Sequence, residues 1–174
     1  MSTYAIDTTH SEVGFTVRHM MFAKVRGQFK TWSATLAWDA ANPAKSTVEV
    51  SLDTASIDTR ETARDNHLRS ADFFDAEKFP KMVFKSKRVE ATGKGKYALV
   101  GDLTIRDVTR ELTLDVTETG SGKDPWGNAR LGFTATASLK RSDWGLTWNQ
   151  ALEAGGVLVS DKVDLDVEVQ VIQK

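Results

Sequence analysis

Apolar and polar side chains alternate along most of this chain, which is the pattern of β-strands with one apolar and one polar face. The clearest alternation stands near the C-terminus, where every second residue is apolar: Val163, Leu165, Val167, Val169 and Val171. Eight segments show this period, near residues 11–20, 26–39, 46–57, 81–91, 96–106, 109–119, 129–141 and 158–172. One apolar face per strand is typical of antiparallel sheets, so we predict an all-β protein.

The length of these segments favours a closed barrel over an open sheet. Several exceed nine residues, whereas strands usually have about five or six. Long antiparallel strands twist, and a sheet of them tends to close and bury its edges. Eight strands enclose an interior that is either filled by side chains or holds one small ligand. We therefore predict an eight-stranded antiparallel β-barrel, with a two-layer sandwich as the alternative that alternation alone does not separate.

The connection between residues 59 and 80 breaks the alternation. Thr59 or Thr62 is able to cap a short helix, and Asp72 is able to begin a second one that ends before Pro80. We therefore predict short helices in the 59–80 connection. With only 3 prolines in 174 residues and no low-complexity tract, nothing marks a domain boundary, and we predict a single domain over residues 1–174.

Composition and charge exclude several classes of function. The chain has no cysteine, which rules out a disulfide, a thiolate nucleophile and a cysteine-ligated metal. A formal net charge of −1 removes the bulk electrostatic argument for nucleic acid and leaves only a local basic patch open. The longest apolar stretch has six residues, Ala154–Val159, against about 20 for a membrane-spanning helix, so we expect no integral membrane segment. The first residues lack the basic and apolar regions of a secretory signal, and we expect a cytoplasmic protein.

The histidines are the first candidates for catalysis. His10 and Ser11 are neighbours, which point to opposite faces of a strand, and no nucleophile elbow surrounds Ser11. His19 shares a face with Phe15 and Val17, where it serves either as a hydrogen-bonded core residue or as a contact for a ligand head group. No spacing of His, Asp and Glu resembles a metal site, so we expect neither a metal nor a cofactor.

The densest polar cluster of the chain is Arg64-Asp65-Asn66-His67-Leu68-Arg69-Ser70. On a short helix, Arg64 and His67 would lie on one side. Three roles stay open for this cluster: capping and pairing within the helix, neutralisation of an anionic or polar head group, or general-base chemistry at His67.

The apolar face of each strand would line the interior of a barrel. The candidate wall residues share that parity: Phe15, Val17, Phe29, Val48, Val50, Phe84, Leu112, Leu114, Phe133, Leu165 and Val167. His19 is a candidate for the polar end of a ligand, and the further candidates for the head group or the mouth are Arg64, His67, Arg69 and Trp144. The sequence leaves open whether these side chains fill the barrel or surround a cavity.

One long run of residues and several shorter ones form a distinctive pattern. The long run comprises Ser56-Ile57-Asp58-Thr59, Arg64-Asp65, His67-Leu68-Arg69-Ser70, Asp72-Phe73-Phe74-Asp75 and Phe79-Pro80. The shorter ones are Ile6-Asp7 with His10-Ser11, Gly27 with Phe29, Gly101-Asp102-Leu103-Thr104-Ile105, and Arg141-Ser142-Asp143-Trp144-Gly145-Leu146. Together they resemble the YceI-like family, lipocalin-like barrels associated with polyisoprenoid binding. The chain departs from the family pattern at Asp107, Glu111 and Trp144, where glycine, proline and phenylalanine are usual.

The resemblance implies an eight-stranded antiparallel lipocalin-like β-barrel whose interior receives an amphiphile with a long prenyl or fatty-acyl tail. It also implies a homodimer, the common assembly of the relatives. We therefore favour a non-enzymatic protein that binds, transports or sequesters a polyisoprenoid such as an isoprenoid quinone. Two alternatives stay open: an enzyme that acts on a bound isoprenoid lipid through His19 or His67, and a packed barrel used only for protein association.

Overall fold

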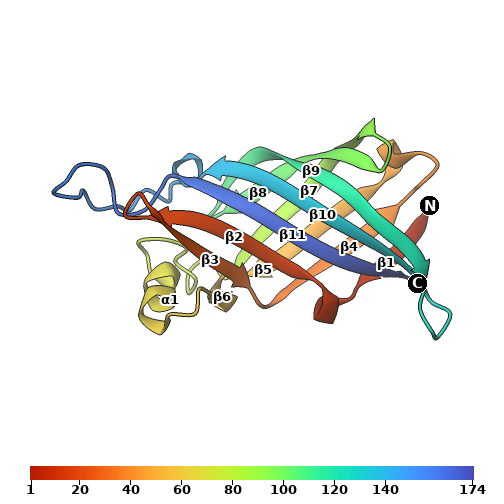
Figure 1. The fold of residues 1–174 in the computed structure, drawn as a ribbon, viewed down its shortest axis with the longest axis horizontal. Coiled ribbons are helices and arrows are strands. Elements are labelled where there is room, and N and C mark those ends of the chain that lie inside the picture. The colour runs from red at the N-terminus through yellow and green to blue at the C-terminus, as the bar shows by residue number, and fades with distance from the viewer.

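Eleven strands of the computed structural model, which describes residues 1–174, form one antiparallel sheet that closes on itself (Figure 1). The strands are β1 Ser2–Ile6, β2 Glu12–His19, β3 Ala23–Phe29, β4 Trp32–Trp38, β5 Thr47–Asp53, β6 Ile57–Asp58, β7 Lys81–Gly93, β8 Lys96–Ile105, β9 Val108–Lys123, β10 Ala129–Lys140 and β11 Lys162–Gln173. Short 3-10 turns lie at Thr8–His10, Pro43–Lys45, Thr54–Ser56 and Arg141–Trp144.

Eight of these strands make the closed ring, in the order β1-β4-β5-β7-β8-β9-β10-β11, and β1 closes it by pairing with β11. The other three strands continue the first three positions of the ring toward the opposite end. There β2 pairs with β11, β3 pairs with β2, and β6 pairs with β3. The prediction of an eight-stranded antiparallel barrel is therefore confirmed, with three of the eight strands broken in two.

The breaks have local causes that hydrophobic periodicity does not report. Between β1 and β2, the carboxylate of Asp7 accepts a hydrogen bond from the backbone N–H of Thr9 at 3.1 Å and caps a 3-10 turn. Between β3 and β4, Lys30 donates its backbone N–H to the carbonyl of Ser56 at 3.2 Å. The predicted strand over residues 26–39 is therefore two strands, and β1 lies outside every predicted segment.

An aromatic cluster closes the end of the barrel where both termini lie (Figure 1). Its buried members are Tyr4, Leu36, Trp38, Phe133 and Val171. The ring of Trp38 meets the rings of Tyr97 and Phe133 edge to face, with centroids 5.0 and 5.5 Å apart. Such edge-to-face pairs pack densely, so this end of the barrel is plugged by side chains.

The helix α1, Thr62–Arg69, covers the opposite end (Figure 1). Phe73, which follows the helix, is buried in the larger core cluster, and Leu68 and Phe74 pack against that cluster. The second predicted helix is absent: residues 71–78 form hydrogen-bonded turns, because Asp75 takes a positive φ of 47° and directs the chain back toward Ser70. No helix in the structure is long and apolar enough to cross a membrane.

Candidate ligand cavity

The interior of the barrel is a cavity of about 730 Å³, within the range of about 300–1,000 Å³ that small-molecule sites occupy. Of the 48 residues that line it, 39 are hydrophobic. The solvent-accessible surface of 10028 Å² also exceeds the roughly 8,400 Å² expected for a folded monomer of 19.2 kDa. Inward-facing residues such as Val17, Leu165 and Val167 are correspondingly only half-buried. The side chains therefore surround a hollow interior and do not fill it.

Most of the predicted wall residues lie at this cavity. The lining includes Phe15, Val17, His19, Phe29, Val48, Val50, Phe84, Leu114, Phe133, Leu165 and Val167. The same alternation would have found further lining residues, among them Val13 and Val163, which share their parity with Phe15 and Leu165.

Leu112 is the one predicted wall residue that does not reach the cavity. It is buried in the larger core cluster and stands opposite Gly101 across the β8–β9 pair. The ring of Phe84 lies over Gly101, since a Cβ atom on that glycine would stand 2.5 Å from Phe84 Cζ. Phe84 thus takes the lining position beside Leu112.

Polar lining residues gather at the end of the barrel that carries α1 and the β2–β3 turn. Besides Gly14 and Ser46, the lining residues that are not hydrophobic all come from this end: Arg18, His19, Thr59, Glu61, Arg64, His67 and Arg141. Arg64 and Arg141 bring two guanidinium groups to this end against the one carboxylate of Glu61, so this end, which we call the basic mouth, carries an excess of positive charge. The opposite end of the cavity meets the aromatic cluster. An amphiphile fits this arrangement with its head at the basic mouth and its tail toward the aromatic cluster.

Arg64 and Asp65 are held together by Thr59 at the start of α1. The backbone N–H and the hydroxyl of Thr59 donate to Asp65 Oδ1 at 2.8 and 2.5 Å. Arg64 donates from Nε to the Thr59 hydroxyl and from Nη2 to the Thr59 carbonyl, both at 2.7 Å. The buried carboxylate of Asp65 is thereby satisfied, and the guanidinium of Arg64 is fixed at the mouth.

His67 makes contacts that orient its ring. Its Nε2 lies 2.8 Å from Asp72 Oδ2, and the ring packs edge-on against Phe73 and Trp148, with centroids 5.1 and 4.5 Å apart. No serine or threonine hydroxyl is hydrogen-bonded to either His67 or His19. Neither histidine therefore forms the hydroxyl–imidazole pair that activates a serine or threonine nucleophile.

Arg141 is a buried cation that closes the mouth on the β10 side. It donates from Nε to the carbonyl of Ser160 at 2.9 Å and from Nη1 to that of Leu146 at 2.7 Å. It also donates to the Val159 carbonyl at 3.3 Å, and its guanidinium lies over the ring of Phe73. Burial lowers the pKa of Arg141, against the opposing charge of Asp161.

The structure places two of the mouth candidates away from the cavity. Arg69 ties α1 to the chain before and within β6, because Nε donates to the Ala55 carbonyl at 2.8 Å and Nη2 to the Ile57 carbonyl at 3.1 Å. Trp144 is buried, and its indole N–H donates to the Leu103 carbonyl at 2.9 Å. Both side chains hold the fold around the mouth, since neither lines the cavity.

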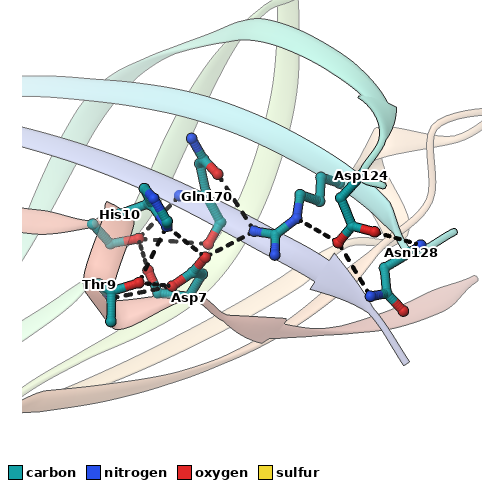
Figure 2. A network of polar contacts seen from close by, with 8 residues as sticks. Asp7, Thr9, His10, Asp124, Asn128 and Gln170 are labelled. Atoms are coloured by element: carbon teal, nitrogen blue, oxygen red, sulfur yellow. Dashed lines mark hydrogen bonds and ion pairs between the residues drawn. The ribbon is translucent and has the colours of Figure 1, made fainter. Parts of the chain in front are cut away.

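A polar network at the opposite end connects Asp7 with Asp124, as Figure 2 shows, and its central residue is Arg130. Arg130 donates from Nη1 to Asp7 Oδ2 at 2.8 Å and from Nε to Asp124 Oδ2 at 2.9 Å. Asp124 also accepts the backbone N–H groups of Trp126 and Asn128, each at 2.9 Å. The network thus ties the β9–β10 turn to the break between β1 and β2.

The two carboxylates of this network are held ionised. Hydrogen bonds from Thr9, then Arg130 and His10, keep the pKa of Asp7 well below its usual range. Burial raises the pKa of Asp124, but hydrogen bonds from Asn128 and Arg130 outweigh it and leave that pKa at about 2. The same two carboxylates raise the pKa of Arg130. These groups are charged at neutral pH and serve structure at the closed end.

The sequence of this barrel matches a known domain family along nearly its whole length. The profile of the YceI-like domain matches residues 4–171. The chain belongs to the YceI-like family. Among its YceI-like relatives, a UPF0312 protein of Pseudomonas savastanoi is 38% identical over 173 residues, which covers 98% of this chain and 86% of the relative. A UPF0312 protein of Vibrio cholerae is 37% identical over 173 residues, with 98% and 87% covered.

Solved structures of YceI-like and related proteins share the barrel. BcnA of Burkholderia cenocepacia superposes with a TM-score of 0.84 at 25% identity, over 95% of this chain and 98% of that one. The YCEI protein of Campylobacter jejuni gives 0.76 at 33% identity, over 100% and 99%. A polyisoprenoid binding domain from Saccharophagus degradans, implicated in plant cell wall breakdown, gives 0.71 at 14% identity over 100% of both chains. At that identity, the last likeness shows the fold alone.

Proposed function

We propose that this YceI-like protein binds a polyisoprenoid, such as an isoprenoid quinone or a similar long-chain amphiphile, and carries or sequesters it without changing it chemically. The observation that carries the proposal is the apolar cavity of about 730 Å³, which is plugged by aromatic rings at one end and polar at the other. The Saccharophagus degradans domain, which has the same barrel fold, is named for the binding of this class of ligand.

Burial of the tail supplies the affinity. Each methylene-sized group that leaves water contributes about 0.8 kcal/mol, so ten such groups contribute roughly 8 kcal/mol before the cost of ordering the ligand. The lining offers the tail almost no hydrogen-bonding group, so tails of different chemistry are poorly discriminated. The head group is selected at the basic mouth, where Arg64, His67 and Arg141 lie.

The proposal of a non-enzymatic role is supported by the contacts of the two histidines at the mouth, since neither has a hydroxyl nucleophile as a partner. In the test, a prenylated quinone is bound to the protein and followed by mass spectrometry after extraction. We expect the mass of the extracted lipid to stay unchanged over time, for the wild type and for His19→Ala and His67→Ala alike. If the wild type converts the bound lipid and either variant abolishes this conversion, the protein is an enzyme instead.

A cavity-blocking variant tests the site of binding. Val167 lines the cavity and belongs to neither core cluster, so Val167→Trp places an indole in the empty space. We expect this variant to fold and to lose at least tenfold in affinity for a prenylated quinone, measured by titration in dilute detergent. The matched control is Glu168→Trp on the outer face of the same strand, with unchanged affinity. Equal affinity of both variants and the wild type would place the ligand outside the barrel.

The resemblance also supports a homodimer as a proposal about the assembly. Light scattering coupled to size-exclusion chromatography tests it, with a mass near twice that of the chain as the expected result and the mass of a single chain as the contrary one.

A further inference from the structure

The turn between β2 and β3 carries exposed apolar side chains at the end of the barrel with the basic mouth. Because His19 pairs with Ala23, the turn consists of Met20, Met21 and Phe22. These side chains are 40%, 58% and 75% exposed. Together with Val157 in the neighbouring loop, they are four of the seven large apolar residues that the chain leaves exposed. Such a concentration of apolar surface marks an interaction site.

The backbone of this turn is unfavourable for the residues that it contains. Met20 and Met21 have φ angles of 54° and 71°, in the left-handed region. Turns of this kind normally use glycine or asparagine there, because a side chain with a Cβ atom is strained. The turn therefore holds two methionines at a conformational cost, and neither contributes to a core. Strain of this kind at an exposed position points to a function outside the fold.

A loop before β11 holds the turn in place. Met20 donates its backbone N–H to the carbonyl of Leu158 at 2.7 Å. Met21 packs on Gly156, where an added Cβ atom would stand 3.0 Å from the Met21 Sδ atom. In Figure 1 this loop lies at the same end of the barrel as the β2–β3 turn and extends beyond it. The apolar turn is thus held in place at this end of the barrel.

Cationic side chains stand directly behind the apolar turn. Arg18 and Lys24 are paired across β2 and β3, and Arg26 follows opposite Thr16. All three are exposed, and none takes part in an ion pair. Like charges placed directly across two strands destabilise a hairpin, so this pair is a second feature that the fold does not require.

Two of the nearest carboxylates lie away from the protruding edge, and a third, Glu153, lies in the loop that holds the turn. Asp164 and Asp166 are on β11 opposite Thr16 and Gly14, further down the barrel than the pair of Arg18 and Lys24. Glu153 is the one carboxylate of the loop between residues 146 and 160. An apolar tip followed by positive charge matches the layers of an anionic bilayer, in which acyl chains lie beneath negatively charged head groups.

The tip adjoins the entrance of the cavity. Arg18, His19, Leu158 and Val159 all line the cavity, and His19 forms a β-bridge with Val159. We infer that the β2–β3 turn is a docking finger for the surface of an anionic lipid bilayer: it inserts Met20, Met21 and Phe22 among the lipids, while Arg18 and Lys24 bind lipid head groups. The biological role of this docking rests on the proposed function, because docking brings the mouth of the cavity to the membrane from which a water-insoluble ligand enters.

Cosedimentation with lipid vesicles tests the docking finger on the full chain without any added ligand. The vesicles contain phosphatidylcholine alone, or phosphatidylcholine with a quarter of phosphatidylglycerol. We expect binding to the vesicles with phosphatidylglycerol that weakens as salt is added, because salt screens surface charge. Wild-type protein that stays in the supernatant of both, or that binds both equally, overturns the inference.

Three single variants assign the binding to the turn. Phe22→Ser removes the most exposed side chain of the tip, and we expect about tenfold weaker partitioning. Trp126→Ser is the matched control, since Trp126 is 80% exposed on the β9–β10 turn at the opposite end, and we expect no change. Phe22→Trp keeps an aromatic anchor and keeps binding. Equal losses in Phe22→Ser and Trp126→Ser overturn the inference.

The charged rim has its own control. The double variant Arg18→Gln with Lys24→Gln loses about 25-fold in affinity for anionic vesicles, at roughly fivefold for each charge. Lys94→Gln with Lys96→Gln removes the same charge from the β7–β8 hairpin at the far end, and there we expect less than a twofold change. If both double variants lose the same affinity for anionic vesicles, binding depends only on the net charge of the protein, and the docking finger is refuted.

Uptake of a short-chain prenyl quinone from vesicle-free solution separates this inference from the proposed function. Phe22→Ser should take up the quinone like the wild type while it fails on vesicles. Absence of uptake by the wild type would refute the proposed function and leave the vesicle result to decide on the docking finger.

Discussion

Buried and half-buried arginines in this barrel differ in what they bind, and those contacts decide what each one does. Arg141 donates to three backbone carbonyls and Arg69 to two, so both hold loops in place. Arg64 donates to Thr59 alone and still faces the cavity. Arg130 is different again, because its partners are two carboxylates. Arginine therefore has three roles in this barrel: it holds loops through their carbonyl groups, places positive charge at the mouth, and joins two carboxylates at the closed end.

The polar network around Arg130 predicts how stability depends on pH. The pKa of Asp124 in the folded protein is about 2 and that of Asp7 is well below its usual range, whereas both are about 4 in an unfolded chain. The unfolded state therefore binds more protons between these values, and the stabilisation that is complete above about pH 4 is lost as the pH falls toward 2. We expect the free energy of unfolding, measured by urea titration, to fall over this window.

Arg130→Gln identifies the source of this dependence. The variant removes the hydrogen bonds that lower both carboxylate pKa values, so we expect lower stability at pH 7 and a flatter loss between pH 4 and 2. Arg110→Gln on β9 serves as the control, because Arg110 is exposed and in no ion pair. A pH profile of Arg130→Gln parallel to that of the wild type would contradict the assignment.

Most strands of the barrel are predictable from the sequence, because burial of one face of a strand leaves an alternation of apolar and polar residues. That alternation predicts the ring of strands and the long hairpins from β7 to β11, and its interruption predicts the helix in the 59–80 connection. The breaks within three strands are not predicted by it. They depend on contacts such as the one between Lys30 and Ser56, which lie 26 positions apart. The types of these residues alone do not predict such a contact.

Gly101 on β8 tests how closely neighbouring elements pack. A Cβ atom there would stand 2.5 Å both from the ring of Phe84 and from the carbonyl oxygen of Lys85. Backbone does not move aside cheaply, so we expect Gly101→Ala to lower the free energy of unfolding by about 1–3 kcal/mol. Gly120→Ala on β9 is the matched control, since nothing lies within 4 Å of its Cβ position. Chemical denaturation of both variants measures the difference in the free energy of unfolding. Equal stabilities would show that Phe84 and the backbone of β7 move to accommodate the added methyl group at little cost.

For the molecule as a whole, the decisive property is the empty interior, and the alternation of residues did not determine it. The pattern predicts which side chains face inward but not whether they meet across the barrel. That depends on where the large rings stand. Trp38 and Phe133 cluster at the closed end, whereas Phe15 and Phe29 stand along the wall among smaller residues such as Val167 and leave the interior open. Aromatic rings therefore plug only the closed end of the barrel.

The dimensions of that space predict how affinity depends on the length of a bound tail. The 12 residues of β11 span about 40 Å, and a tilt near 40° reduces this to a barrel height of roughly 30 Å. The aromatic cluster occupies part of that height. An extended carbon chain advances about 1.3 Å per bond, given a C–C length of about 1.5 Å, so the cavity holds roughly 20 carbon atoms in extended form.

We therefore expect the dissociation constant to fall about three- to fourfold for each added methylene, following the burial of about 0.8 kcal/mol per group, and to level off near 20 carbons. A series of fatty acids and prenyl alcohols of increasing length, titrated by calorimetry in dilute detergent, measures the slope and the plateau. Val167→Trp should bring the plateau to a shorter chain without changing the slope below it, because the indole shortens the space and leaves the remaining wall intact. An affinity that is independent of tail length, or that rises without limit, would mean that the tail lies outside the barrel.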